Sequence, residues 1–131
     1  MTNPNEFGLA QIGQISVNVH ELERAVAFYR DSLGIKHLFT IPKMSFFDCG
    51  GLRLMLAIPE KPEFDHPSSI LYFKVDNIQR SHEILVARGV RFESPPVLIA
   101  AMATYDLWMA FFRDSENNLL SLMSEVPKET V

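Results

Sequence analysis

The chain has 131 residues, of which 47% are hydrophobic and 21% charged, ordinary values for one compact folded domain. Its formal net charge of −4 disfavours a nucleic-acid partner, because binding to phosphate backbones needs a basic surface. The single cysteine, Cys49, excludes an internal disulfide. The first ten residues lack the pattern of a signal peptide, and no apolar run approaches the roughly 18 residues of a membrane span. We therefore expect a cytoplasmic protein without a membrane partner.

The first half of the chain is predicted to form a strand, a helix and three more strands. Polar and apolar residues alternate over residues 14–19, which predicts a strand with Ile15, Val17 and Val19 on its apolar face. Apolar residues then recur at three- and four-residue spacing, which predicts an amphipathic helix ended by Gly34. The remaining strands of this half are predicted at 37–41, 44–49 and 52–58.

The second half repeats this order after a linker at 59–68, PEKPEFDHPS, which holds three prolines. A strand is predicted at 70–75 and a helix at 77–88. Asp76 followed by Gln79 predicts a capping box at the start of this helix. Further strands are predicted at 90–93, 97–103, 107–113 and 119–124, the last two joined by the turn DSENN at 114–118.

The two halves align with each other when one is shifted by 56 residues, which places Val75 on Val19 and Ile78 on Leu22. The chain therefore reads as two βαβββ modules, at about 12–58 and 69–124, within a single domain over 1–131. This is an α+β fold in which each helix covers one face of its own mixed sheet. The other sheet faces are free to curl around a shared cavity.

Three separated segments carry a pattern that is specific in its order and spacing. They are VHELERAVAFYRDSLG at 19–34, VDNI and ARGV in the second half, and FFRDSENNLLSLM near the end. Together they resemble the vicinal oxygen chelate superfamily, which includes glyoxalase I, bleomycin-resistance proteins and extradiol dioxygenases. The resemblance covers about residues 12–124 and implies a glyoxalase-like fold, a small-molecule ligand and a homodimer. It does not fix the chemistry, since the superfamily holds isomerases, lyases, dioxygenases, transferases and plain binding proteins.

The resemblance also implies positions for metal ligands, on the first and last strands of each module. In the superfamily these are usually His, Gln or Glu, which suit divalent ions. Here the positions fall on Gln14, Ile70, Ser121 and Met55 or a neighbour. Only Gln14 is a plausible ligand, because isoleucine has no donor, a neutral hydroxyl is a poor ligand and a thioether is too soft. We therefore predict no conventional metal site and no cofactor.

Side-chain alternation gives a set of candidate ligand-binding residues around the cavity. Arg53 supplies one cation that suits a ligand with a polar or acidic end. His66, in the linker, could fold over the cavity mouth, and Trp108 lies on a strand rich in aromatic residues. The complete candidate set is Gln14, Ser16, Asn18, Arg53, Met55, His66, Ile70, Tyr72, Trp108 and Ser121.

Two classes of function remain open from the sequence. The first is a metal-independent binding protein, similar to bleomycin-resistance proteins, that holds a flat aromatic or acidic compound without catalysis. The second is a divergent glyoxalase-like lyase, isomerase or dioxygenase, or an enzyme that uses groups such as His66 and Asp106 for acid–base chemistry. The incomplete set of metal ligands favours the first, and no catalytic residue is assigned.

Overall fold

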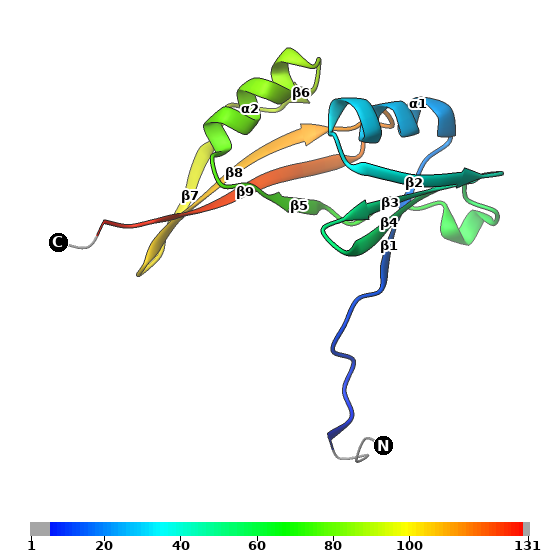
Figure 1. Cartoon of the computed structure of the whole chain (residues 1–131), viewed down its shortest axis with the longest axis horizontal. Helices are drawn as coiled ribbons and strands as arrows, with labels where there is room; N and C mark the ends of the chain where they lie inside the picture. Colours follow the sequence, from blue (N-terminus) through cyan, green and yellow to red (C-terminus); the bar gives the residue numbers. More distant parts are fainter. Residues whose placement is uncertain (1–5, 130–131) are drawn as a thin grey trace.

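The structure, a computed structural model, describes residues 6–129, so the outermost residues of the predicted domain, 1–5 and 130–131, lie outside it. It contains two mixed β-sheets, each with one helix on the same side of the molecule (Figure 1). The predicted α+β class with two curled sheets is confirmed. No helix within residues 6–129 has both the length and the apolar character needed to cross a membrane.

Sheet 1 is built from the first half of the chain, and its strand order is β1-β4-β3-β2. Strand β1 pairs in parallel with β4, and the other two pairs are antiparallel. The bounds are β1 Gln14–Asn18, β2 Lys36–Ile41, β3 Met44–Cys49 and β4 Leu52–Ala57. As the alternation predicts, Val17 and Val19 are buried in the core, whereas Gln14 and Ser16 are exposed.

Sheet 2 is built from the second half, with the order β5-β9-β8-β6 and with β7 also paired to β8. Its central pair is the antiparallel β8–β9 hairpin, and β5 pairs in parallel with β9. The bounds are β5 Leu71–Lys74, β6 Arg91–Phe92, β7 Val97–Ala101, β8 Tyr105–Arg113 and β9 Leu119–Pro127. In the sequence between β4 and β5, the linker contains a short 3-10 helix, η3 (Pro62–Phe64).

The first helix departs from the uniform helix that the sequence predicts. An α-helical part, α1 (Leu22–Ala27), passes into a wider π-helix, η2 (Phe28–Ser32). The backbone N–H of Leu33 donates to the carbonyl of Phe28, five residues earlier, at 3.0 Å. This wider turn contains Tyr29, whose side chain is fully buried and points to the second half of the chain.

The second helix, α2 (Ile78–Ala87), begins one residue later than the predicted capping box requires. The N-cap is Asn77, not Asp76, and its side chain accepts a hydrogen bond from the backbone N–H of Arg80 at 3.1 Å. The helix ends at Ala87, and Gly89 follows the C-cap Arg88 with a φ of +87°, a left-handed conformation that glycine adopts without strain.

The two halves are joined through the turn between β8 and β9. Asp114, only 2% exposed, accepts a hydrogen bond from the Tyr29 hydroxyl at 2.7 Å. Asn118 donates from its side chain to the carbonyl of Asn18 at 3.2 Å. The turn DSENN of the second half therefore packs against the first half of the chain.

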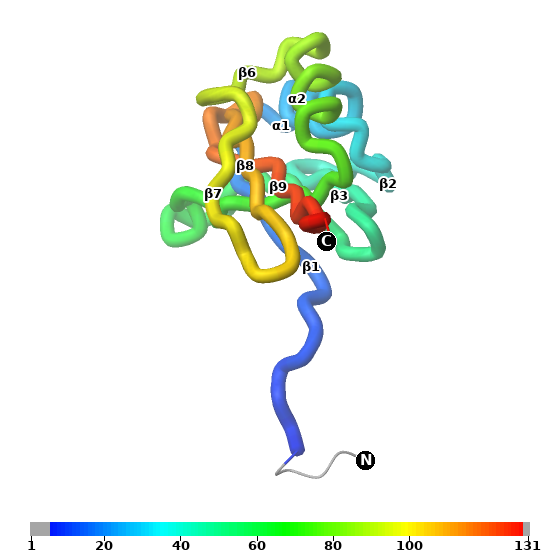
Figure 2. Tube along the Cα trace, turned by 90° about the vertical axis from the view of Figure 1, so that its left-hand side faces the viewer, coloured from blue at the N-terminus to red at the C-terminus, as the bar shows by residue number. Residues whose placement is uncertain are grey.

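The chain before β1 runs away from the body of the molecule as an extended arm (Figures 1 and 2). Phe7, Leu9 and Ile12 on this arm are exposed, with Leu9 at 95%. Strand β1 lies at the edge of sheet 1, and β5 lies at the edge of sheet 2.

Candidate functional site

The face of sheet 1 that points away from α1 gathers four of the candidate residues. Gln14 lies in register with Arg53, and Ser16 with Met55, across the parallel β1–β4 pair. Residues in register point to the same side of a sheet, so these four side chains share one surface. We refer to this surface as the open face, and it continues onto β3 and β2 through Phe46 and Phe39.

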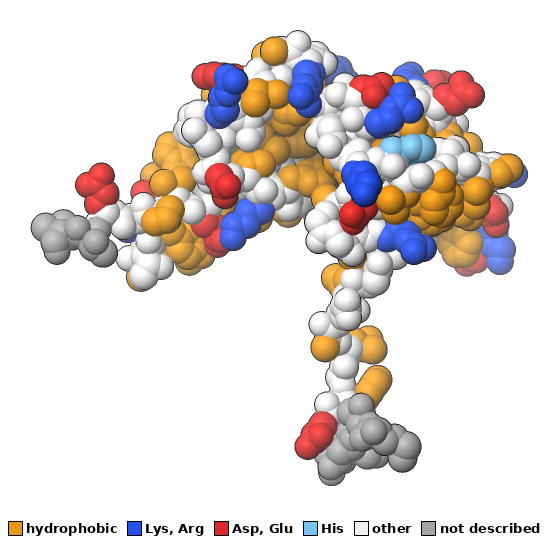
Figure 3. Space-filling model, in the orientation of Figure 1, with side chains coloured by type: hydrophobic (Ala, Val, Ile, Leu, Met, Phe, Trp, Pro, Cys, Tyr) orange, Lys and Arg blue, Asp and Glu red, His pale blue; other side chains and the backbone are white. Residues whose placement is uncertain are grey.

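The open face has an apolar floor with one cation above it. The Arg53 guanidinium lies 5.7 Å from the centre of the Phe46 ring, and the Phe39 and Phe46 rings are 4.7 Å apart. The side-chain amide of Gln14 approaches the sulfur of Met55 at 3.7 Å. Figure 3 shows hydrophobic side chains gathered over β2 and β3. Within residues 6–129, Arg53 takes part in no ion pair, so its charge is available to a ligand.

The corresponding face of sheet 2 holds Tyr72 and Ser121, which lie in register across the β5–β9 pair. Tyr72 is 44% exposed and meets Phe111 edge to face at 6.0 Å. Ser121 is fully buried, and its hydroxyl donates to backbone carbonyls, with the carbonyl of Leu122 at 2.7 Å. Ile70, just before β5, is exposed. Of this group, Tyr72 and Ile70 therefore offer accessible surface.

Trp108 lies on the opposite face of sheet 2, and its expected place beside the cavity is wrong. It is in register with Ser124, and its side chain packs against the core cluster under α2. Asp106 points to the same side as Trp108 and pairs with Lys128 at 3.6 Å. Asp106 lies at the start of β8, at the other end of the molecule from the linker that carries His66 (Figure 1). The structure therefore does not bring His66 and Asp106 together as an acid–base pair.

Asn18 and His66 meet in a small polar cavity of about 190 Å³ at the start of α1. The Asn18 side chain donates to the backbone carbonyls of Phe64 and His66, at 2.6 and 2.8 Å. These bonds hold the linker against the end of β1. The amide of Asn18 is thus engaged by the linker, and its role in this structure is to position the chain.

The same cavity contains three titratable residues that the sequence reasoning did not select: His20, Asp65 and Glu116. His20 lies between the two carboxylates, with Nε2 3.1 Å from Asp65 and Nδ1 3.4 Å from Glu116. Asp65 comes from the linker and Glu116 from the β8–β9 turn, so no local pattern joins them. The acidic and amide residues of DSENN are the one signal in the sequence that this turn contacts other parts of the chain.

Glu116 caps the first helix from the far end of the sequence. Its carboxylate accepts from the backbone N–H groups of His20 and Glu21 at 2.7 and 3.3 Å, and from Arg24 at 3.3 Å. Burial raises the pKa of Glu116, but these three hydrogen bonds outweigh burial and hold its pKa below the usual range. Its charge is therefore committed to the helix start, where the orphan N–H groups favour an anion.

The described part of the chain contains no cluster of three or more His, Cys, Asp or Glu side chains with the spacing of a metal site. The positions that the resemblance implies for ligands hold Gln14, Met55, Ile70 and Ser121. Burial raises the pKa of the Cys49 thiol, with a smaller contribution from Asp48, so this cysteine stays protonated at neutral pH.

Comparison with known proteins agrees with the fold. The model of the Glyoxalase/Bleomycin resistance protein/Dioxygenase superfamily matches residues 11–122. The protein YraH of Bacillus subtilis is 26% identical over 123 residues, which cover 83% of this chain and 94% of YraH.

Solved structures share the fold at low identity. A glyoxalase/bleomycin resistance protein/dioxygenase from Nocardioides superposes with a TM-score of 0.72 at 20% identity, over 95% of this chain and 91% of its own. The fosfomycin resistance protein FosX from Listeria monocytogenes superposes with a TM-score of 0.70 at 18% identity, over 89% and 94% of the two chains. With the family match spanning most of the sequence, the chain belongs to the Glyoxalase/Bleomycin resistance protein/Dioxygenase superfamily.

Proposed function

We propose that the protein binds a small monocarboxylic acid with a flat apolar body on the open face of sheet 1, without a conventional metal site. The observation that supports this most directly is Arg53, an exposed guanidinium above an aromatic floor with no carboxylate partner in residues 6–129. A carboxylate would form charge-assisted hydrogen bonds with Arg53, which are about twice as strong as neutral ones. The apolar body would lie on Phe46, Phe39 and Met55.

The neighbouring charge limits the ligand to one acidic group. Asp48 lies in register with Arg53 on the adjacent strand, and its Oδ1 accepts from the backbone N–H of Gly51 at 2.8 Å. A second negative charge on the ligand would approach this carboxylate and be repelled. The carboxamide of Gln14 can donate a further hydrogen bond at the same end of the ligand.

A second copy of the chain is part of the proposal, because one chain covers only one side of such a ligand. Phe39, Ile41 and Tyr72 are between 44% and 47% exposed, and β1 and β2 form the two unpaired edges of sheet 1. Exposed apolar faces and free strand edges favour association with another chain. We therefore propose a homodimer in which the open faces are closed by the partner.

Binding can be tested with 1-naphthoate as the probe, followed by backbone amide NMR shifts of the full-length protein. We expect saturable shifts on β1, β3 and β4, and an affinity about tenfold weaker in Arg53→Ala, the loss of one charge-assisted contact. Arg30→Ala is the matched control, because Arg30 is exposed on the helix side and pairs with Asp31 at 2.8 Å. Equal binding to both variants, or shifts confined to other elements, would refute the proposal.

The metal and the assembly have their own measurements. Elemental analysis of protein purified without chelators is expected to give well under one divalent metal per chain. A stoichiometric metal that is lost in Gln14→Ala would instead favour the divergent enzyme. Light scattering at micromolar concentration is expected to give about twice the 14.9 kDa of one chain, and a value near 14.9 kDa would exclude the dimer.

A further inference from the structure

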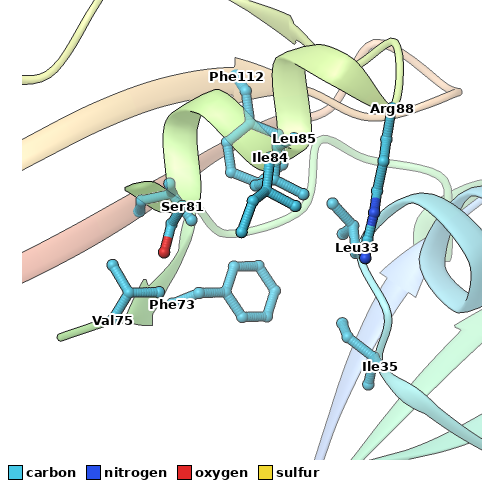
Figure 4. A pocket seen from close by; sticks show the side chains of 10 residues that line it. Leu33, Ile35, Phe73, Val75, Ser81, Ile84, Leu85, Arg88 and Phe112 are labelled. Carbon is cyan, nitrogen blue, oxygen red and sulfur yellow. The ribbon is translucent and has the colours of Figure 1, made fainter. Parts of the chain in front are cut away.

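A second hollow lies on the helix side of the molecule, away from the open face. It is a cleft of about 300 Å³ between α2, strand β5 and the turn that follows η2 (Figures 3 and 4). We refer to it as the interhelical cleft. Its walls come from both halves of the chain, and its lining residues are Leu33, Ile35, Phe73, Val75, Ser81, Ile84, Leu85, Arg88, Phe112 and Leu122.

The apolar lining of this cleft is incompletely covered by the protein itself. Phe112 and Leu122 at its base are buried, but Leu33, Phe73 and Ile84 on its walls are only half-buried. These walls bring together apolar side chains from two separate units, which leaves a gap between them. An apolar group placed in the gap would remove this remaining surface from water, which is favourable in proportion to the area buried.

Two polar side chains lie at opposite sides of the cleft. Figure 4 shows Arg88 extending down beside Leu33, and Ser81 with its hydroxyl directed into the hollow near Val75. Arg88 donates one hydrogen bond, from Nη1 to the carbonyl of Ser32 at 3.2 Å. Among residues 6–129 no carboxylate forms an ion pair with Arg88. The remaining N–H groups of this guanidinium are therefore available to an acidic ligand.

We propose that the interhelical cleft binds a small amphipathic monocarboxylic acid, with its carboxylate on Arg88 and its apolar chain lying across Phe73 and Ile84 toward Ser81. The cleft volume is at the small end of the range for ligand sites, which fits a medium-length chain. Such a ligand would also lie against Leu33 of the first half, which lines the same cleft. This site is independent of the open face and of Arg53.

The probe for this site is octanoate, titrated into the full-length protein and followed by backbone amide NMR shifts at neutral pH. We expect saturable shifts on α2, on β5 and on the turn after η2. Binding is expected to weaken about tenfold in Arg88→Gln, as the charge-assisted contact is lost. Arg80→Gln is the matched control, because Arg80 lies on the same helix but outside the cleft and pairs with Glu83 at 3.8 Å.

The wild-type protein supplies a test that does not depend on any variant folding. Octan-1-ol has the same chain without the charge and is expected to bind about tenfold more weakly than octanoate. Arg53→Ala is expected to leave octanoate binding unchanged, and Arg88→Gln to leave 1-naphthoate binding on the open face unchanged, so the two sites are distinguished. Equal affinity for octanoate and octan-1-ol, unchanged binding in Arg88→Gln, or shifts confined to the open face would each overturn the proposal.

Discussion

Replacement of Asp114 by asparagine is expected to destabilise the protein strongly, although the two side chains have nearly the same shape. Oδ1 of Asp114 accepts from the backbone N–H groups of Glu116 and Asn118, both at 2.8 Å. Oδ2 accepts from the Tyr29 hydroxyl at 2.7 Å and from the Asn118 amide at 3.0 Å. An asparagine can keep the first pair as weaker neutral bonds, but it turns an N–H₂ group toward the Asn118 amide.

The Asn118 amide cannot simply flip to relieve this conflict, because it also donates to the carbonyl of Asn18 at 3.2 Å. Hydrogen bonds to a charged group stabilise by about 1.5–3 kcal/mol and neutral ones by about 1 kcal/mol. Weakening the two backbone bonds and losing the Asn118 bond therefore costs at least about 2.5 kcal/mol, before any loss of the Tyr29 bond. This is a large share of the roughly 5–15 kcal/mol that stabilises a typical domain.

Urea denaturation at neutral pH, followed by circular dichroism, measures this loss as a fall of at least about 1 M in the midpoint. Asp31→Asn is the matched control: Asp31 is exposed and pairs with its neighbour Arg30, so its replacement is expected to change stability by less than about 0.5 kcal/mol. If Asp114→Asn were as stable as Asp31→Asn, the turn between β8 and β9 would not hold the two halves together as described.

Three further outcomes are expected. Burial, with a smaller contribution from Asp114, raises the pKa of Tyr29. The stability that this shift provides is therefore complete below about pH 10 and is lost as the pH rises through the folded pKa. In Tyr29→Phe, the denaturation midpoint should fall less steeply with pH above about pH 9. Hydrogen bonds to Glu116 outweigh its burial and lower its pKa. Its contribution to stability is therefore present above about pH 4.3 and is lost as the pH falls through the folded pKa. In the same assay, Glu116→Gln should lose stability less steeply as the solution is acidified. Val17→Asp buries an unpaired charge under α1 and should cost several kcal/mol of stability or unfold the chain. The change Ser16→Ala, at an exposed position, should alter stability by less than about 1 kcal/mol. Thermal melts compare the two variants, and the reverse order of stability would show that the faces of β1 are assigned backwards.

Sequence reasoning succeeded where a local pattern carries the information. The alternation in β1 has one polar and one apolar phase, so it identifies which side faces the core, and Val17 is buried as expected. Strand β8 has bulky residues in both phases, so alternation could not decide the side of Trp108. Its register with Ser124 on β9, a tertiary contact, makes that decision. The adjacent capping residues Asp76 and Asn77 likewise left the start of α2 uncertain by one residue.

The polar cavity at the start of α1 could not be read from the sequence for a different reason. His20 contacts Asp65 across 45 positions and Glu116 across 96 positions. No periodicity extends over such separations, and each residue taken alone has an ordinary surface role. Only the packing of the linker and of the β8–β9 turn against the first helix brings these groups into contact.

The long reach of Glu116 also bears on the order in which the chain folds. The cap of the second helix is local, because Asn77 lies directly before it. The first helix gains its capping carboxylate only after Glu116, 96 residues after His20, has been made. Contacts between distant positions form late, because the intervening chain loses entropy when its ends meet. We therefore expect the earlier-made half of this protein to complete its structure only after the later-made half has folded against it.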